Sequence, residues 1–234
     1  MRSQARLAGA LYLVIIIAAG FAEVFVRGRL VVSGDAAATA ANILAYESLY
    51  RLGGAADLIA FVCDVFVALI FYELFRPVNA TLSLLAAFFR LLHVAVMAVD
   101  SINHFAPLLL LRAGQLPSLA FVFLRLHALG YNIALVFFGC HCLLIGYLIC
   151  RSRYLPRLLG ILMAVAGFCY IVNSFANFLA PVFAAALFPW ILVPAAAAEW
   201  TLTGWLLIAG ARAPVGDTGE AERHSGMIPN TIGA

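Results

Sequence analysis

The sequence has no lysine and few charged residues of any kind. Its 234 residues include 14 basic side chains, all of them arginine, and charged residues make up only 11% of the chain. A soluble domain carries about 25% charged residues, which its water-facing surface needs. Because 65% of the residues are hydrophobic, the composition excludes an ordinary water-facing surface and indicates a protein that lies in a lipid bilayer.

Two further shortages narrow the class of protein. The net charge is only +3 and the arginines are scattered, so binding of nucleic acid is not expected. Cysteine is sparse, and an odd number inside apolar runs argues against a disulfide framework. Cys140 and Cys142 lie on roughly opposite faces of a helix and cannot share a metal ion with His141. We therefore expect packing roles and no metal site for the five cysteines, which are Cys63, Cys140, Cys142, Cys150 and Cys169.

Six apolar runs are each long enough to cross the hydrocarbon core as a helix, which takes about 20 residues. Turn-forming residues separate the runs, as in Arg76-Pro77-Val78-Asn79 after the second. We therefore predict an all-α integral membrane bundle of six transmembrane helices, which forms one domain over residues 1–209. The predicted spans are residues 6–27, 50–76, 80–111, 119–150, 157–180 and 188–209.

The segments outside the spans are short. Arg2 and Arg6 precede the first run as in a signal peptide, but the run is longer than the usual stretch of about 7–15 residues, so we expect it to stay as a helix. Residues 34–48 predict a short interfacial helix capped by Asp35, or alternatively a lid over a cavity. Residues 210–234 are rich in Gly, Pro and charge without periodicity, and they predict a disordered cytoplasmic tail.

The placement of arginine predicts the orientation of the bundle. Cytoplasmic loops are enriched in basic residues, and an internal N-terminus puts the larger number of arginines inside. The sequence therefore predicts that both termini are cytoplasmic, in a bacterial plasma (inner) membrane. The inner arginines are then Arg2, Arg6, Arg76, Arg151, Arg153, Arg157, Arg212 and Arg223, and the outer ones are Arg27, Arg29, Arg51 and Arg112.

Several short motifs along the chain are similar to those of one family. They are Ala5-Arg6-Leu7-Ala8-Gly9, Gly34-Asp35-Ala36-Ala37-Ala38-Thr39-Ala40-Ala41-Asn42-Ile43, Arg76-Pro77-Val78-Asn79, Leu126-His127-Ala128-Leu129-Gly130-Tyr131, Val136-Phe137-Phe138-Gly139 and Gly146-Tyr147-Leu148-Ile149-Cys150-Arg151-Ser152. Together they resemble a bacterial multi-pass membrane family catalogued as domain-of-unknown-function 4386, over roughly residues 5–208. The resemblance implies a membrane location and implies no activity or site residue.

Ionisable side chains inside the predicted spans are the candidate functional residues. Each costs at least about 2.5–3.5 kcal/mol at the centre of a span and normally faces the interior of the bundle. Counting about 1.5 Å per residue from the outer helix ends concentrates them in the outer half of the bundle. We predict a polar cavity open to the outer face, with the candidate residues Asp57, Asp64, Asp100, His104, Arg125, His127 and Glu199.

An alternative is that these residues only pair with one another and hold the helices together. Asp57 and Arg125 lie at matched depth and are predicted to pair, and Asp64 or Glu73 is predicted to neutralise Arg90. Histidines in spans most often form interhelical hydrogen bonds. Pairing between helices alone would need fewer ionisable residues than the spans contain. We therefore favour a cavity that binds a small solute, a lipid head group or protons.

Four functions are compatible with the sequence. We favour binding or transport of a small solute, lipid or proton, although the chain shows no inverted repeat or broken-helix pair. The bilayer and a small-molecule or lipid ligand are then the expected partners. An enzyme is the weakest hypothesis, because Gly-x-Ser-x-Gly and His-Glu-x-x-His motifs are absent. A non-catalytic membrane protein that acts through partners is another.

Electron transfer through haem b is the fourth hypothesis. His127 and His141 are fourteen residues apart on one predicted helix, nearly in phase and about 21 Å apart along its axis. His104 and His93 on the preceding span could supply the opposite axial ligands of two haems. Their spacing of eleven residues fits this arrangement less well. Apart from this haem, no cofactor is expected.

Overall fold

The computed structural model describes residues 2–211, and helices make up almost all of that range. Most of the predicted tail, from residue 212 to residue 234, lies outside the described residues. A π-helical turn, Phe21–Arg27, joins the first two helices, and a 3-10 turn, Trp190–Leu192, precedes the last. The helices are α1 Arg2–Gly20, α2 Gly28–Leu30, α3 Ala36–Ala45, α4 Glu47–Phe75, α5 Ala80–Arg112, α6 Pro117–Arg151, α7 Arg157–Leu179, α8 Pro181–Leu187 and α9 Val193–Ile208.

The prediction of six membrane-spanning helices is confirmed. Six helical segments in the described range are long and apolar enough to cross a bilayer. Their bounds agree with the predicted ones to within a few residues, and the protein is a multi-pass helical membrane protein. The segments are Arg2–Leu30, Glu47–Phe75, Ala80–Arg112, Pro117–Arg151, Arg157–Leu179 and Trp190–Ile208.

The first span contains an irregular turn. It continues past its predicted end at residue 27 to Leu30, through the π-helical turn Phe21–Arg27. A π-helical turn widens the helix locally and is frequent at functional sites. In this chain the turn carries Glu23 and Arg27, both of which belong to the candidate site described below.

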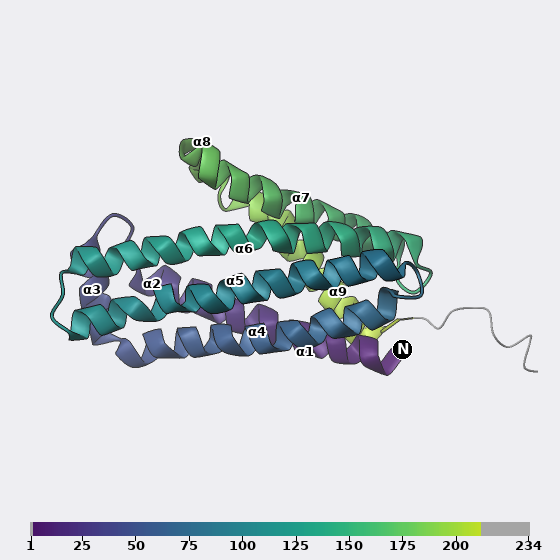
Figure 1. The fold of residues 1–234 in the computed structure, drawn as a ribbon, viewed down its shortest axis with the longest axis horizontal. Helices are drawn as coiled ribbons and strands as arrows, with labels where there is room; N and C mark the ends of the chain where they lie inside the picture. Colours follow the sequence, from purple (N-terminus) through teal and green to yellow (C-terminus); the bar gives the residue numbers. More distant parts are fainter. Residues whose placement is uncertain (1, 212–234) are drawn as a thin grey trace, which may run out of the picture.

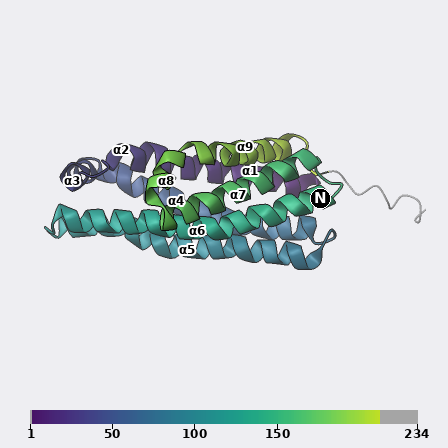
Figure 2. The same ribbon diagram turned by 90° about the horizontal axis from the view of Figure 1, so that it is seen from above.

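The six spans form a closed ring. In order around the ring, α1 packs on α4, α4 on α5, α5 on α6, α6 on α7 and α7 on α9, and α9 packs back on α1. Figure 2 shows α1 and α9 on one side of the bundle and α5 and α6 on the opposite side. The interior of such a ring is where ionisable side chains avoid lipid.

Glycines bring α6 and α7 into close contact. A Cβ atom on Gly146 would lie 2.6 Å from the carbonyl oxygen of Gly160, and one on Gly139 would lie 2.8 Å from that of Gly167. Larger residues would therefore push the two backbones apart, as is usual where small residues line a contact between membrane helices. Beyond this contact α7 diverges from α6 as it approaches α8 (Figure 1).

The helices differ in length, so one end of the bundle lacks α7. Asn173 of α7 donates a hydrogen bond to Asn132 of α6, 3.2 Å away. From that level α7 runs only six residues further, to Leu179, whereas α6 extends fifteen residues in the same direction, to Pro117. The N-terminal part of α6 therefore projects beyond α7 by roughly 13 Å, at about 1.5 Å per residue.

A short helix lies at this projecting end, which we call the α3 end. Asp35 caps α3 by accepting a hydrogen bond from the Ala38 amide, 2.8 Å away. The helix packs on α6 and α5. The short helix predicted in residues 34–48 is thus present as Ala36–Ala45, and its position at a membrane interface stays a prediction.

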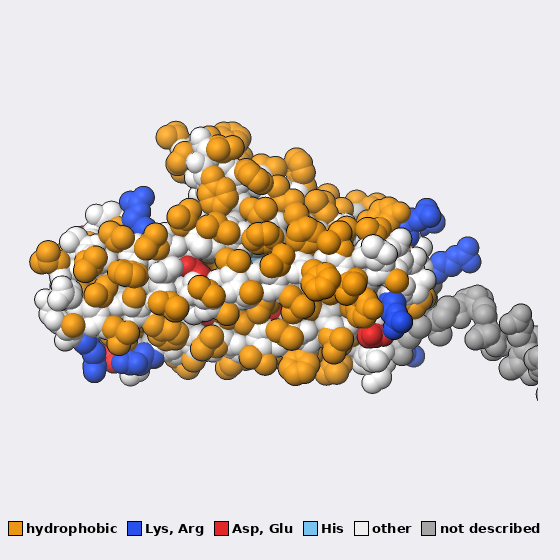
Figure 3. Space-filling model, viewed as in Figure 1, with side chains coloured by type: hydrophobic (Ala, Val, Ile, Leu, Met, Phe, Trp, Pro, Cys, Tyr) orange, Lys and Arg blue, Asp and Glu red, His pale blue; other side chains and the backbone are white. Residues whose placement is uncertain are grey.

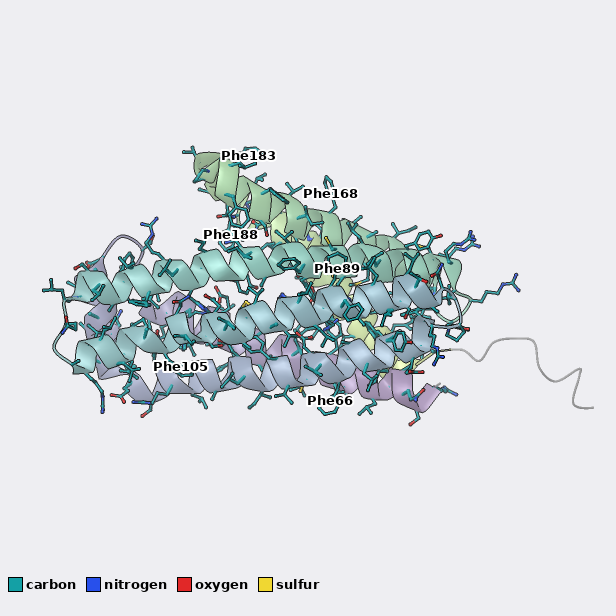
Figure 4. All side chains as sticks on the ribbon, in the orientation of Figure 1. Phe66, Phe89, Phe105, Phe168, Phe183 and Phe188 are labelled. Carbon is teal, nitrogen blue, oxygen red and sulfur yellow. The ribbon has the colours of Figure 1, made fainter. Side chains whose placement is uncertain are left out.

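The flank of the bundle is apolar. Figure 3 shows hydrophobic side chains along the length of this face, with arginines gathered toward its two ends. Phe66, Phe168 and Phe183 are each more than half exposed, and Figure 4 shows them at the outside of the helices. Lipid tails accept such side chains, so this flank is the surface that contacts the bilayer.

Candidate functional site

A cavity of about 110 Å³ lies inside the ring, and all six spans contribute to its wall. The volume is sufficient for several water molecules or a small solute. Aromatic and aliphatic side chains form most of the wall, and three tyrosines, Tyr12, Tyr131 and Tyr170, add hydroxyl groups. The ionisable residues of the wall are Glu23 and Arg27 of the first span, Asp57 and Asp64 of α4, His93 of α5 and Glu199 of α9.

Arg27 holds two carboxylates at one edge of the cavity. Its Nη1 atom lies 2.6 Å from Asp57 Oδ2, and its Nε atom lies 2.6 Å from Glu23 Oε2. The side chains of Arg27 and Asp57 are buried, with exposures of 10% and 7%, whereas that of Glu23 is 56% exposed. Glu23 thus both lines the cavity and is exposed at the outside of the bundle.

The prediction that Asp57 pairs with Arg125 is wrong. Asp57 pairs with Arg27, and Arg125 is exposed on the surface of α6. The first span runs on to Leu30, which keeps Arg27 on a helix beside α4. Arg125 lies near the level at which α7 ends, on a face of α6 that points away from the ring. Neither the extra length of the first span nor the rotation of α6 follows from counting residues along single helices.

Arg90 of α5 is fully buried next to the cavity. Its guanidinium pairs with Asp64 and lies over the ring of Tyr12, 4.7 Å from the ring centre. Its Nη1 atom donates to His141 Nε2 at 3.0 Å, and His141 Nδ1 donates to the Ala86 carbonyl at 2.8 Å. Asp64 or Glu73 was predicted to neutralise Arg90, and the structure shows Asp64 in that role, with Glu73 exposed. These contacts join α1, α4, α5 and α6.

Glu199 of α9 lines the cavity without an arginine partner in residues 2–211. The Tyr170 hydroxyl donates a hydrogen bond to its Oε1 atom at 2.5 Å. A neutral hydroxyl does not cancel the charge of a carboxylate, and an uncancelled charge in an apolar span is costly. A proton or a cation beside the carboxylate would each remove this cost.

The ionised groups around the cavity do not balance. Four carboxylates line the cavity, those of Glu23, Asp57, Asp64 and Glu199. Among the described residues, its wall contains one arginine, Arg27. Arg90 adds a second guanidinium behind Asp64. When the carboxylates and the two guanidinium groups are ionised and His93 is neutral, four negative charges face two positive ones, and this excess of two negative charges favours cations over anions.

Three other predicted candidates form a second polar cluster, toward the α3 end between α5 and α6. His127 Nδ1 lies 2.7 Å from Asp100 Oδ2, within ion-pair distance but without hydrogen-bond geometry. His127 Nε2 and His104 Nδ1 are buried and have no partner among the described residues. Gly130 leaves the space on α6 that the Asp100 carboxylate occupies. This cluster is not part of the cavity wall.

The structure thus separates the predicted candidates into three groups. Asp57, Asp64 and Glu199 line the cavity, the cluster of Asp100, His104 and His127 stands apart from it, and Arg125 belongs to neither. Within residues 2–211, no group of three or more His, Cys, Asp and Glu side chains is arranged to hold a metal ion.

Three of the four histidines considered as haem ligands are packed against aromatic side chains. The Phe138 ring contacts both His93 and His141, with ring centres 4.9 and 5.8 Å away. The Tyr50 ring stacks on His104 at 4.4 Å, and His104 Nε2 donates to the Tyr50 carbonyl at 3.2 Å. These rings fill positions that a porphyrin would need, so the residues as placed do not fit two bis-histidine haems. Binding of haem b stays a prediction, which an absorption spectrum can test.

Sequence reasoning missed Arg27 and the cavity tyrosines. Arg27 falls at the predicted end of the first span and counts there as an outer residue. Glu23 was the available signal, because opposite charges four residues apart share one face of a helix. The tyrosines carry no comparable signal, since their place inside the ring depends on how each helix is rotated.

Comparison with known proteins agrees with the fold and adds no activity. The family model described as "Domain of unknown function (DUF4386)" matches residues 7–210. An "Uncharacterized protein" of Archaeoglobus fulgidus is 32% identical over 117 residues, which cover 50% of this chain and 62% of the relative. The chain thus spans less than two thirds of the length of this curated relative. No solved structure matches the chain.

Proposed function

The chain belongs to the DUF4386 family of membrane proteins, and from the cavity within its six spans we propose that it binds a small cation or a proton there and moves it across the membrane. The observation that carries the proposal is Glu199, a carboxylate in an apolar span that lines the cavity. Its one hydrogen-bond partner in residues 2–211 is the Tyr170 hydroxyl, 2.5 Å away. The excess of carboxylates over arginines around the cavity also supports a positively charged ligand.

Exchange at Glu199 gives the proposal a mechanism. In one state Glu199 carries a proton, and in the other the proton has left and a cation occupies the cavity beside the carboxylate. Each state neutralises the group, so the two ligands compete for it and the movement of one is coupled to that of the other. Tyr170 keeps the carboxyl group oriented toward the cavity in both states.

The route into the cavity is from the side of Glu23. This exposed carboxylate draws cations toward the opening, and Arg27 beside it is held by Asp57 and Glu23. In the opposite direction lies Tyr12 of the cavity wall, and behind it Arg90 packs over the rings of Tyr12 and Phe71 within the apolar core. Passage to the other side therefore requires this core to rearrange, which is the expected behaviour of a protein that opens to one side at a time.

Proton flux into liposomes tests the proposal. Purified protein is reconstituted with a pH-sensitive dye inside, a potassium diffusion potential is applied, and internal pH is followed with and without external methylammonium or guanidinium. We expect proton entry that depends on the protein and that one of these cations alters. Absence of both proton flux and a cation effect in folded, reconstituted protein would contradict the proposal and favour a protein that acts through partners.

Glu199→Gln is the informative variant, because the amide keeps the shape of the side chain but cannot exchange a proton. Its matched control is Glu73→Gln, which removes a carboxylate that is exposed and does not line the cavity. We expect flux to be lost in the first variant and retained in the second. Equal flux in both variants would exclude Glu199 as the exchanging group.

We also propose that the protein lies in a bacterial plasma membrane with both of its termini in the cytoplasm. In the described range, the end of the bundle that holds the N-terminus carries six arginines, and the α3 end carries four exposed ones. The end of a membrane bundle that carries more basic residues usually faces the cytoplasm. The six are Arg2, Arg6, Arg76, Arg151, Arg153 and Arg157, and the four are Arg29, Arg51, Arg112 and Arg125.

A further inference from the structure

A second cavity, of about 390 Å³, lies at the end of the bundle that holds the N-terminus. The turn between α4 and α5 forms one wall, and the end of α6 with the turn that follows forms the other. Ser152 and Tyr154 are buried and form its base. Arg151 and Arg153 line it and are exposed. We call this cavity the arginine cleft.

The charge of the arginine cleft is positive. Its lining in the described range contains two arginines and no acidic residue. Neither Arg151 nor Arg153 forms an ion pair with a carboxylate of residues 2–211. Guanidinium groups bind phosphate oxygens through paired N–H donors, with better geometry and strength than neutral donors provide. The cleft is therefore suited to an oxyanion.

The position of the cleft adds an apolar component. Tyr147 lines it one turn before the end of α6 and is 49% exposed, on the flank that contacts lipid. Tyrosines in this position sit at the level of lipid head groups, with the ring toward the acyl chains. The arginine cleft thus opens both to the polar face of the bilayer and to its hydrocarbon edge.

We propose that the arginine cleft binds an anionic phospholipid, with the phosphate between Arg151 and Arg153 and the acyl chains passing Tyr147. Basic pockets between spans are known to accept such head groups. A free phosphate ion would satisfy the arginines but would leave the apolar edge at Tyr147 unused. The site is independent of Glu199, because it lies in a different cavity and requires no exchange of protons.

Native mass spectrometry of the full-length protein tests this site. The protein is titrated in detergent with phosphatidylglycerol and, separately, with phosphatidylcholine of the same acyl chains. We expect retained phosphatidylglycerol and a weaker association of phosphatidylcholine. Arg151→Gln/Arg153→Gln should lower the affinity for phosphatidylglycerol roughly tenfold. Both positions are exposed, so we expect the variant to fold, and size-exclusion chromatography checks that it does.

The matched control is Arg76→Gln/Arg157→Gln, which removes the same charge from the same end at exposed positions that do not line the cleft. We expect its affinity for phosphatidylglycerol to be unchanged. If both double variants lost the same affinity for phosphatidylglycerol, the lipid would be responding to the overall positive charge of this end of the bundle. That result would overturn the proposal. Equal binding of the two lipids, or displacement of phosphatidylglycerol by millimolar inorganic phosphate, would also overturn it, the latter by assigning the cleft to free anions.

Discussion

Arg27 Nη1 lies 2.6 Å from Asp57 Oδ2, and this contact ties the π-helical turn of the first span to α4 beside the cavity. Both side chains are at least nine-tenths buried. Removing one partner of a buried pair leaves the other charge uncompensated and costs about 3–5 kcal/mol. Asp57→Asn should therefore lower the free energy of unfolding in detergent by an amount of this order, reduced by the remaining contact of Arg27 with Glu23.

A double-mutant cycle measures this coupling. Arg27→Gln/Asp57→Asn should recover at least about 1 kcal/mol relative to the sum of the single changes, because residues in contact are not additive. Arg125→Gln is the control, since Arg125 is exposed and apart from Asp57, and its combination with Asp57→Asn should be additive. Coupling to Arg125 and not to Arg27 would contradict the arrangement of the helices around the cavity.

The contact between α6 and α7 is expected to depend on the absence of a side chain at Gly146. A Cβ atom there would lie 2.6 Å from the Gly160 carbonyl oxygen and 2.7 Å from the Ala164 nitrogen, both of which are backbone atoms. Gly146→Ala should cost about 1–3 kcal/mol, the usual range for overpacking. Gly204→Ala, at a helical position with nothing within 4 Å of the new atom, should be neutral or stabilising. Thermal unfolding of the two variants makes the comparison.

A reduced-minus-oxidised difference spectrum tests the haem hypothesis. We expect no Soret or α-band signal from protein expressed with ample haem, because Phe138 packs against both His93 and His141 and Tyr50 stacks on His104. If a signal appears, loss of one haem in His127→Ala and of another in His141→Ala would assign the ligands.

Reporter fusions test the orientation of the spans. Fusions after residue 115 should report an external position, and fusions after residues 154 or 215 a cytoplasmic one, because the end with the larger number of arginines is expected to stay inside. The reverse pattern would require the cavity opening near Glu23 to face the cytoplasm.

The spans were predictable from the sequence because hydropathy is a local property. Each run of about 20 apolar residues fixes one helix without reference to the others, and the six predicted spans match the structure. Asp64 was one of two partners predicted for Arg90, the other being Glu73, because a charged group deep in a span needs a partner.

The site was predictable only in part, because its geometry depends on how helices are placed against each other. The glycine contact holds α7 against one half of α6, and α7 diverges from α6 beyond that contact. Helix counting assumes equal, parallel spans, and for that reason it placed Arg125 inside the bundle beside Asp57. It also joined Asp100 and His127 to the cavity, whereas they form a separate cluster between α5 and α6.

Infrared difference spectroscopy at Glu199 tests the central claim most directly. If Glu199 exchanges a proton for a cation, adding methylammonium or guanidinium should remove the C=O stretching band of a protonated carboxyl group and release a proton into weakly buffered solution. Both signals should be present in wild-type protein and in Glu73→Gln, and both should be absent in Glu199→Gln. A carboxyl band and a bulk pH that stay constant while either cation binds, or signals that persist in Glu199→Gln, would contradict the account.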